Sequence, residues 1–117
     1  YLHIPVAHGE GNFYAPQDVL QIIEDKNLVS LRYIKDDDTS ANGEFPFNPN
    51  GSINDIAAIC DESGKIMGMM PHPERGMFFT QRDDWTLRKE EYKKQNAEIP
   101  EESDGIKIFK NALEYFK

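Results

Sequence analysis

The chain has little of what marks secreted scaffolds or membrane proteins. It contains one cysteine, Cys60, in 117 residues. A single thiol forms no internal disulfide, which fits a reducing compartment and favours a cytoplasmic protein. The longest apolar runs, such as residues 56–60, are about five residues long, whereas a membrane-spanning helix needs about 20. The composition therefore argues against both a disulfide-stapled fold and a membrane span.

Basic side chains are also scarce. The 13 Lys and Arg residues face 21 Asp and Glu residues, and the formal net charge is −8. Because such a chain repels phosphate backbones and anionic lipids, binding to nucleic acid or to a membrane surface is not expected. Hydrophobic residues make up 38% of the chain, so the core will be modest, and the length suits one domain. The start at Tyr1, without Met or a basic leader, reads as mid-protein sequence and suggests a longer protein.

Strand-like and helix-like patterns alternate along the chain. Turn signals separate them, notably Asn-Pro-Asn-Gly at residues 48–51 and Glu-Ser-Gly-Lys at 62–65. Strands are expected at residues 2–6, 28–34, 56–60 and 66–70, the last two as a hairpin, and helices at residues 16–26, 85–95 and 106–116. Interleaved strands and helices predict an α/β layered domain.

His72 and Glu74 are the residues best suited to proton transfer. They flank Pro73 at the exit of the last predicted strand. An imidazole exchanges a proton near neutral pH, and a neighbouring carboxylate can hold one ring N–H and stabilise the imidazolium. Pro73 stiffens the backbone between them. The bare tripeptide fits a His that merely ends a turn equally well.

A proton relay of this kind needs a nucleophile, and Cys60 is the single thiol. A nucleophilic cysteine in an α/β sheet usually sits on a sharp strand-to-helix elbow between small residues. Cys60 instead precedes Asp61 and Glu62 and ends a predicted hairpin strand. We expect it to be a buried core residue. The chain thus carries a candidate base and its orienting acid without the group they would serve.

Two loops contain further polar residues. The first holds His8, Gly9, Glu10 and Gly11. Two ligand types in one loop do not complete a metal site, so a glycine loop that approaches a substrate or a partner is the preferred interpretation and no metal is expected. The second, Asp36-Asp37-Asp38, is expected to be a solvated loop rather than a cation site.

Taken together, these segments resemble a known family. They are VAHGEG at residues 6–11, NPNGS at 48–52, IAAIC at 56–60, GMMPHPER at 68–75 and DGIKIF at 104–109. In order and spacing they resemble the C-terminal half of the glutaminase subunits of phosphoribosylformylglycinamidine synthases, within the class I glutamine amidotransferases. His-Pro-Glu alone would indicate only some member of that class.

The resemblance implies the C-terminal half of a flavodoxin-like three-layer α/β sandwich, with residues 1–117 forming part of one domain. It also implies a Cys-His-Glu triad that hydrolyses the amide of glutamine, in which His72 is the general base and acid and Glu74 orients it. The family's nucleophile elbow lies upstream and is absent here. The ammonia would pass to a large synthetase subunit that uses ATP and Mg²⁺, with a small bridging subunit also in the complex. No cofactor is expected on this chain.

Two other interpretations remain open. An amidotransferase of another pathway, such as guanine nucleotide or imidazole glycerol phosphate synthesis, would share His72 and Glu74, although the loop at residues 8–11 argues against it. A non-catalytic fragment that only mediates subunit association is the alternative outside enzymes. An upstream Gly-x-Cys-x-Gly segment in the complete gene would favour the catalytic interpretation. An open reading frame that begins near Tyr1 would favour association.

Overall fold

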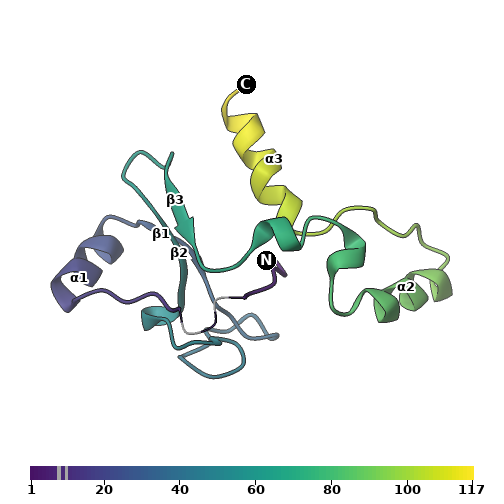
Figure 1. Ribbon diagram of the computed structural model, residues 1–117, viewed down its shortest axis with the longest axis horizontal. Coiled ribbons are helices and arrows are strands. Elements are labelled where there is room, and N and C mark those ends of the chain that lie inside the picture. Colours follow the sequence, from purple (N-terminus) through teal and green to yellow (C-terminus); the bar gives the residue numbers. More distant parts are fainter. Residues whose placement is uncertain (8, 10) are drawn as a thin grey trace. The chain divides into compact units, whose positions relative to one another are not determined.

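A computed structural model describes residues 1–7, 9 and 11–117, and it divides the chain into two compact units (Figure 1). The first unit combines Tyr1–Val6 with His72–Lys117. The second unit is the intervening segment Ala7–Pro71. The first unit is therefore built from two stretches that are distant in the sequence. Among the described residues, the helices are too short or too polar to span a lipid bilayer.

The second unit is built on a three-stranded antiparallel sheet. Its strands are β1 (Val29–Arg32), β2 (Ile56–Cys60) and β3 (Met67–Met69), in the order β1-β2-β3. The β2–β3 hairpin is in register from Ala58 opposite Met69 to Cys60 opposite Met67. The prediction of this hairpin and of the strand before it is confirmed, because the β-branched and apolar runs that indicated them pair as expected.

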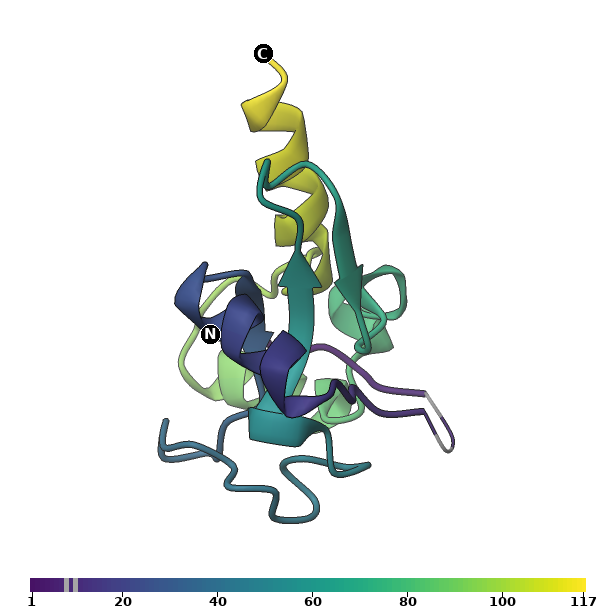
Figure 2. The ribbon, with the colours of Figure 1, turned by 90° about the vertical axis from the view of Figure 1, so that its left-hand side faces the viewer.

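Helix α1 (Gln17–Asp25) packs against this sheet (Figure 2). Pro16 precedes it with φ −57°, a geometry that suits the entry to a helix. Its buried residues Leu20 and Ile23 form the core of the unit with Ala15 and Ile56. Because apolar side chains recur at helical spacing on this one face, the helix is held by burial rather than by intrinsic propensity.

The first unit contains short turns and two helices. Two single-turn 3₁₀ helices, η2 (Pro73–Arg75) and η3 (Phe79–Gln81), follow one another. They are followed by α2 (Trp85–Lys94), which has no buried residue, and by α3 (Gly105–Tyr115). Both helices confirm the prediction, including the exposed, charged character of α2. The loop before α3 runs beside the residues that precede η3, with Phe78 bridged to Glu102.

Two expectations from the sequence are wrong. Residues 2–6 form no strand. Pro5 has no N–H to offer a ladder, and the backbone groups of this segment bond instead to a turn and to a side chain, through Pro5 O and His3 N. Cys60 does lie on a hairpin strand, but it is half-buried rather than buried, since β2 is fully covered only along its first three residues.

Candidate functional site

His72 and Glu74 lie side by side on the turn that follows β3 in the sequence. The ring atom Nδ1 of His72 is 2.7 Å from Oε1 of Glu74. Both side chains reach solvent, with 34% of the His72 side chain and 54% of the Glu74 side chain exposed. The two residues predicted as a pair therefore do meet, and neither is turned into the interior.

The direction of this hydrogen bond fixes the proton on the ring. An ionised carboxylate only accepts, so Nδ1–H of His72 donates to Glu74. In the neutral ring this leaves the lone pair on Nε2, and among the described residues none bonds to that atom. A ring held in this tautomer, with its basic nitrogen free, has the geometry of a general base.

The electrostatics of the turn keep Glu74 ionised. The hydrogen bond from His72 lowers the pKa of the Glu74 carboxyl below its ordinary value, and the neighbouring Arg75 acts in the same direction. Nε of Arg75 is 3.9 Å from the Oε1 atom that accepts from His72. Glu74 is thus available as an acceptor over the range in which an imidazole gains and loses its proton.

Backbone hydrogen bonds within the first unit fix this turn at its first residue, His72. His72 N–H donates to Pro5 O at 2.8 Å, and the turn closes through Arg75 N–H to His72 O at 3.1 Å. Pro73 occupies the first position of η2, where a missing N–H costs nothing. The sequence does not predict the contact with Pro5, because its pattern favours a strand at residues 2–6 and nothing in the spacing links this segment to His72.

The glycine loop at residues 8–11 is only partly described. His8 and Glu10 lie outside the described residues. The carbonyls of Gly9 and Gly11 both accept hydrogen bonds from Nδ2 of Asn50, at 2.6 and 2.8 Å. Asn50 belongs to the Asn-Pro-Asn-Gly turn, which the sequence marked as a turn but not as an anchor for this loop.

The remaining candidates form no site in the described parts of the chain. The thiol of Cys60, at the end of β2, donates to Leu28 O at 3.6 Å, and Leu28 directly precedes β1. Asp37 accepts from the backbone N–H and the hydroxyl of Thr39, which makes its loop a local turn. No group of three or more His, Cys, Asp or Glu residues outside the undescribed positions 8 and 10 is placed to hold a metal ion.

Comparison with known proteins defines the class to which this architecture belongs. The family model of the CobB/CobQ-like glutamine amidotransferase domain matches residues 1–116. The chain belongs to this family of glutamine amidotransferase domains.

Two curated relatives of this chain are PurQ subunits of phosphoribosylformylglycinamidine synthases. A phosphoribosylformylglycinamidine synthase subunit PurQ of Methanococcus maripaludis strain C7 is 48% identical over 117 residues, which are 98% of this chain and 43% of the relative. The PurQ of Dehalococcoides mccartyi is 40% identical over 114 residues, 97% of this chain and 39% of the relative. The chain thus spans less than half the length of these curated relatives.

Proposed function

We propose that this chain supplies the His-Glu part of a Cys-His-Glu triad that hydrolyses the side-chain amide of glutamine. The ammonia would serve the amidation of formylglycinamide ribonucleotide in purine biosynthesis. Family membership and the names of the PurQ relatives support the amidotransferase class and the pathway. The observation that carries the assignment to particular residues is the hydrogen bond of 2.7 Å between Nδ1 of His72 and Glu74.

In the proposed reaction His72 moves protons and Glu74 steadies it. Nε2 of His72 takes the proton of a cysteine thiol, and the thiolate attacks the amide carbon of glutamine. The same nitrogen then gives the proton to the leaving ammonia, and a thioester remains. His72 next removes a proton from water, which cleaves the thioester to glutamate and regenerates the thiol. Throughout, Glu74 holds Nδ1–H and stabilises the imidazolium.

We further propose that the nucleophile comes from a segment outside these 117 residues. Cys60 is the only cysteine of the chain, and its position on β2 gives it none of the features of a nucleophile elbow. With that segment, the chain would form the C-terminal half of a flavodoxin-like three-layer sandwich. The loop of His8, Gly9, Glu10 and Gly11 would then face glutamine or a partner subunit.

The proposed partners follow from the fate of ammonia. Ammonia is largely protonated in neutral solution and is then no nucleophile, so a glutaminase of this kind works best when docked on the enzyme that consumes its product. We propose a large synthetase subunit that uses ATP and Mg²⁺, together with a small bridging subunit, as the complex in which this chain acts.

Replacing His72 by alanine in the complete enzyme tests the assignment. Without Nε2 the thiol loses its base and the leaving ammonia its acid, so we expect glutamine-dependent activity to fall by at least about 100-fold. Ammonia-dependent synthesis, measured with added ammonium salt, is expected to stay near the wild-type rate. The Glu74→Gln variant keeps an oxygen acceptor without the charge. Its glutamine-dependent activity should lie between those of the wild type and the His72→Ala variant.

Two results would contradict the proposal. Wild-type use of glutamine by the His72→Ala enzyme would remove His72 from the reaction. Loss of both activities, together with a lowered melting temperature, would indicate that His72 serves folding of the complex rather than catalysis.

A further inference from the structure

The turn that carries Glu74 is too short to be stable without contacts to other segments. Helix η2 has three residues, none of them buried, and closes with one further bond from Gly76 N–H to Pro73 O. A single 3₁₀ turn is marginal without outside support. Its geometry therefore depends on what packs against its backbone on each side.

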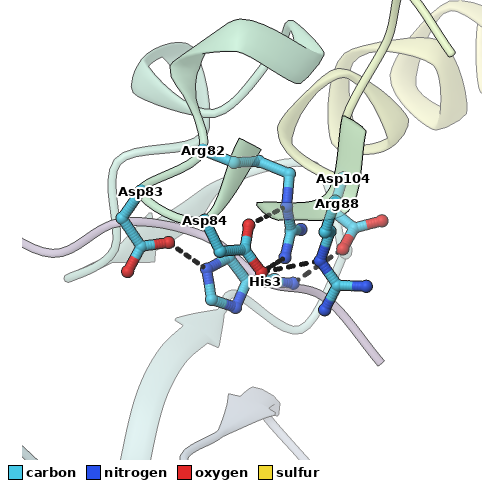
Figure 3. A network of polar contacts seen from close by, with 6 residues as sticks. All are labelled: His3, Arg82, Asp83, Asp84, Arg88 and Asp104. Carbon is cyan, nitrogen blue, oxygen red and sulfur yellow. Dashed lines mark hydrogen bonds and ion pairs between the residues drawn. The ribbon is translucent and has the colours of Figure 1, made fainter. Parts of the chain in front are cut away.

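One side is held by the N-terminal segment. Besides the bond from His72 N–H to Pro5 O, the ring of Pro5 lies against Gly76, where an added Cβ would be 2.9 Å from its Cδ atom. The same segment reaches the start of α3, because the backbone N–H of His3 donates to Oδ2 of Asp104 at 2.9 Å (Figure 3). Residues 3–5 thus connect the start of the turn to the start of α3.

The other side is held by Gly105, the first residue of α3. Its N–H donates to Gly76 O at 2.8 Å. A Cβ at position 105 would stand 2.1 Å from Pro73 O and 2.7 Å from Gly76 O. Both obstacles are backbone atoms of the turn, which no side-chain rotation can relieve. Only glycine allows the helix to approach the turn this closely.

The start of α3 is not free to retreat from the turn. Ser103 N–H donates to Met77 O at 2.8 Å and Phe79 N–H donates to Glu101 O at 2.9 Å. These bonds fix the register of the loop just before α3. A methyl group added at Gly105 would therefore displace Pro73 and its neighbour Glu74 rather than the helix alone.

We infer that Gly105 is a positioning residue, which holds η2 in the one arrangement that lets Glu74 accept from Nδ1 of His72. This inference rests on the function proposed above. Gly105 touches neither substrate nor reacting atoms and acts only through the turn. The chain thereby links the accuracy of its proton relay to the packing of its last helix.

The test is Gly105→Ala in the complete enzyme, with Gly68→Ala as the matched control. Gly68 lies on β3, where an added Cβ meets no atom within 4 Å. Since misplacement of a catalytic group by about 1 Å costs up to about 100-fold, we expect Gly105→Ala to lower kcat with glutamine by about tenfold or more. KM for glutamine and ammonia-dependent synthesis should stay near wild type, and Gly68→Ala should resemble wild type throughout.

A second readout does not depend on activity. The pKa of Glu74, followed by its carboxyl ¹³C shift, should rise toward the ordinary glutamate value in Gly105→Ala, because the bond from His72 is weakened. An unchanged kcat and an unchanged Glu74 titration would overturn the inference even if His72→Ala confirms the function. A raised Glu74 pKa, with His72→Ala still active on glutamine, would support the positioning and refute the proposed function.

Asp104 supplies a pair of variants for the case in which Gly105→Ala does not fold. Asp104→Ala removes the acceptor for His3 N–H, whereas Asp104→Asn keeps an oxygen there. We expect the alanine variant to lower kcat and raise the Glu74 pKa, and the asparagine variant to recover most of both. Equal behaviour of the two variants would overturn the inference.

Discussion

The carboxylate of Asp55 organises the loop between β1 and β2 through four donors. Ser40 Oγ and Asn42 N–H donate to Oδ2 at 2.7 Å, and Gly43 N–H and Asn48 Nδ2 donate to Oδ1 at 2.8 Å. Asp55 is 4% exposed. Burial raises the pKa of such a carboxyl, but these donors together outweigh burial and bring the pKa of Asp55 below its ordinary value.

Replacing Asp55 by alanine should therefore destabilise the second unit. Several donors would lose their acceptor, and each buried donor left unsatisfied costs about 1–3 kcal/mol. We expect a loss of about 3 kcal/mol or more in the free energy of unfolding near pH 7, measured by urea denaturation. Asp37→Ala, which removes an exposed acceptor of the same loop, should cost less than about 1 kcal/mol.

The contribution of the Asp55 carboxylate to the free energy of unfolding should decrease in acid. Because the pKa of Asp55 is lowered in the folded state, its contribution is fully present above the unfolded value of about 3.9 and is lost as the pH falls through the folded value. The stability difference between wild type and Asp55→Ala should thus shrink below about pH 4. A difference that grows in acid would contradict this account of Asp55.

Helix α1 is the element whose stability depends most clearly on one apolar face. Leu20 is buried against Ile56 and its neighbours, whereas Val19 on the same helix is 41% exposed. We expect Leu20→Ala to lower the free energy of unfolding by about 2–5 kcal/mol and Val19→Ala by less than about 1 kcal/mol. Thermal unfolding of both variants would measure these losses. Equal costs would show that the helix does not pack as described.

Helices and the hairpin were predictable because their signals are local. Pro16 before an amphipathic run and the alternation of apolar runs with turn residues each act over a few positions. The error at residues 2–6 has the opposite cause. A short β-branched stretch becomes a strand only if a partner strand is available, and here its backbone bonds to His72 and Asp104 instead.

At the candidate site, too, the local geometry was predictable from the sequence and the long-range contacts were not. The closeness of His72 and Glu74 was predictable, since two residues on one proline-stiffened turn are adjacent by covalent geometry. The residues that support the turn from outside could not be predicted from the sequence. The contacts of Pro5 and Gly105 with it join residues about 30 to 70 positions apart, and no single residue type announces them.

The proposed function gives the entire chain only one part of an active site. Because Cys60 is the only cysteine of the chain and its thiol donates to Leu28 O, the purified 117-residue chain should release no ammonia from glutamine above a buffer blank. The complete enzyme, assayed in parallel for ammonia, serves as the positive control. Measurable turnover by the chain alone would show that it contains its own nucleophile.

The division of the first unit into two distant stretches has a consequence for synthesis on the ribosome. The second unit has all of its residues once Pro71 has left the exit tunnel, and domains fold as units during translation. The stretch Tyr1–Val6 must wait, because the groups that it binds follow at His72 and beyond. The turn that carries Glu74 would thus gain its full backbone support only after Gly105 has emerged.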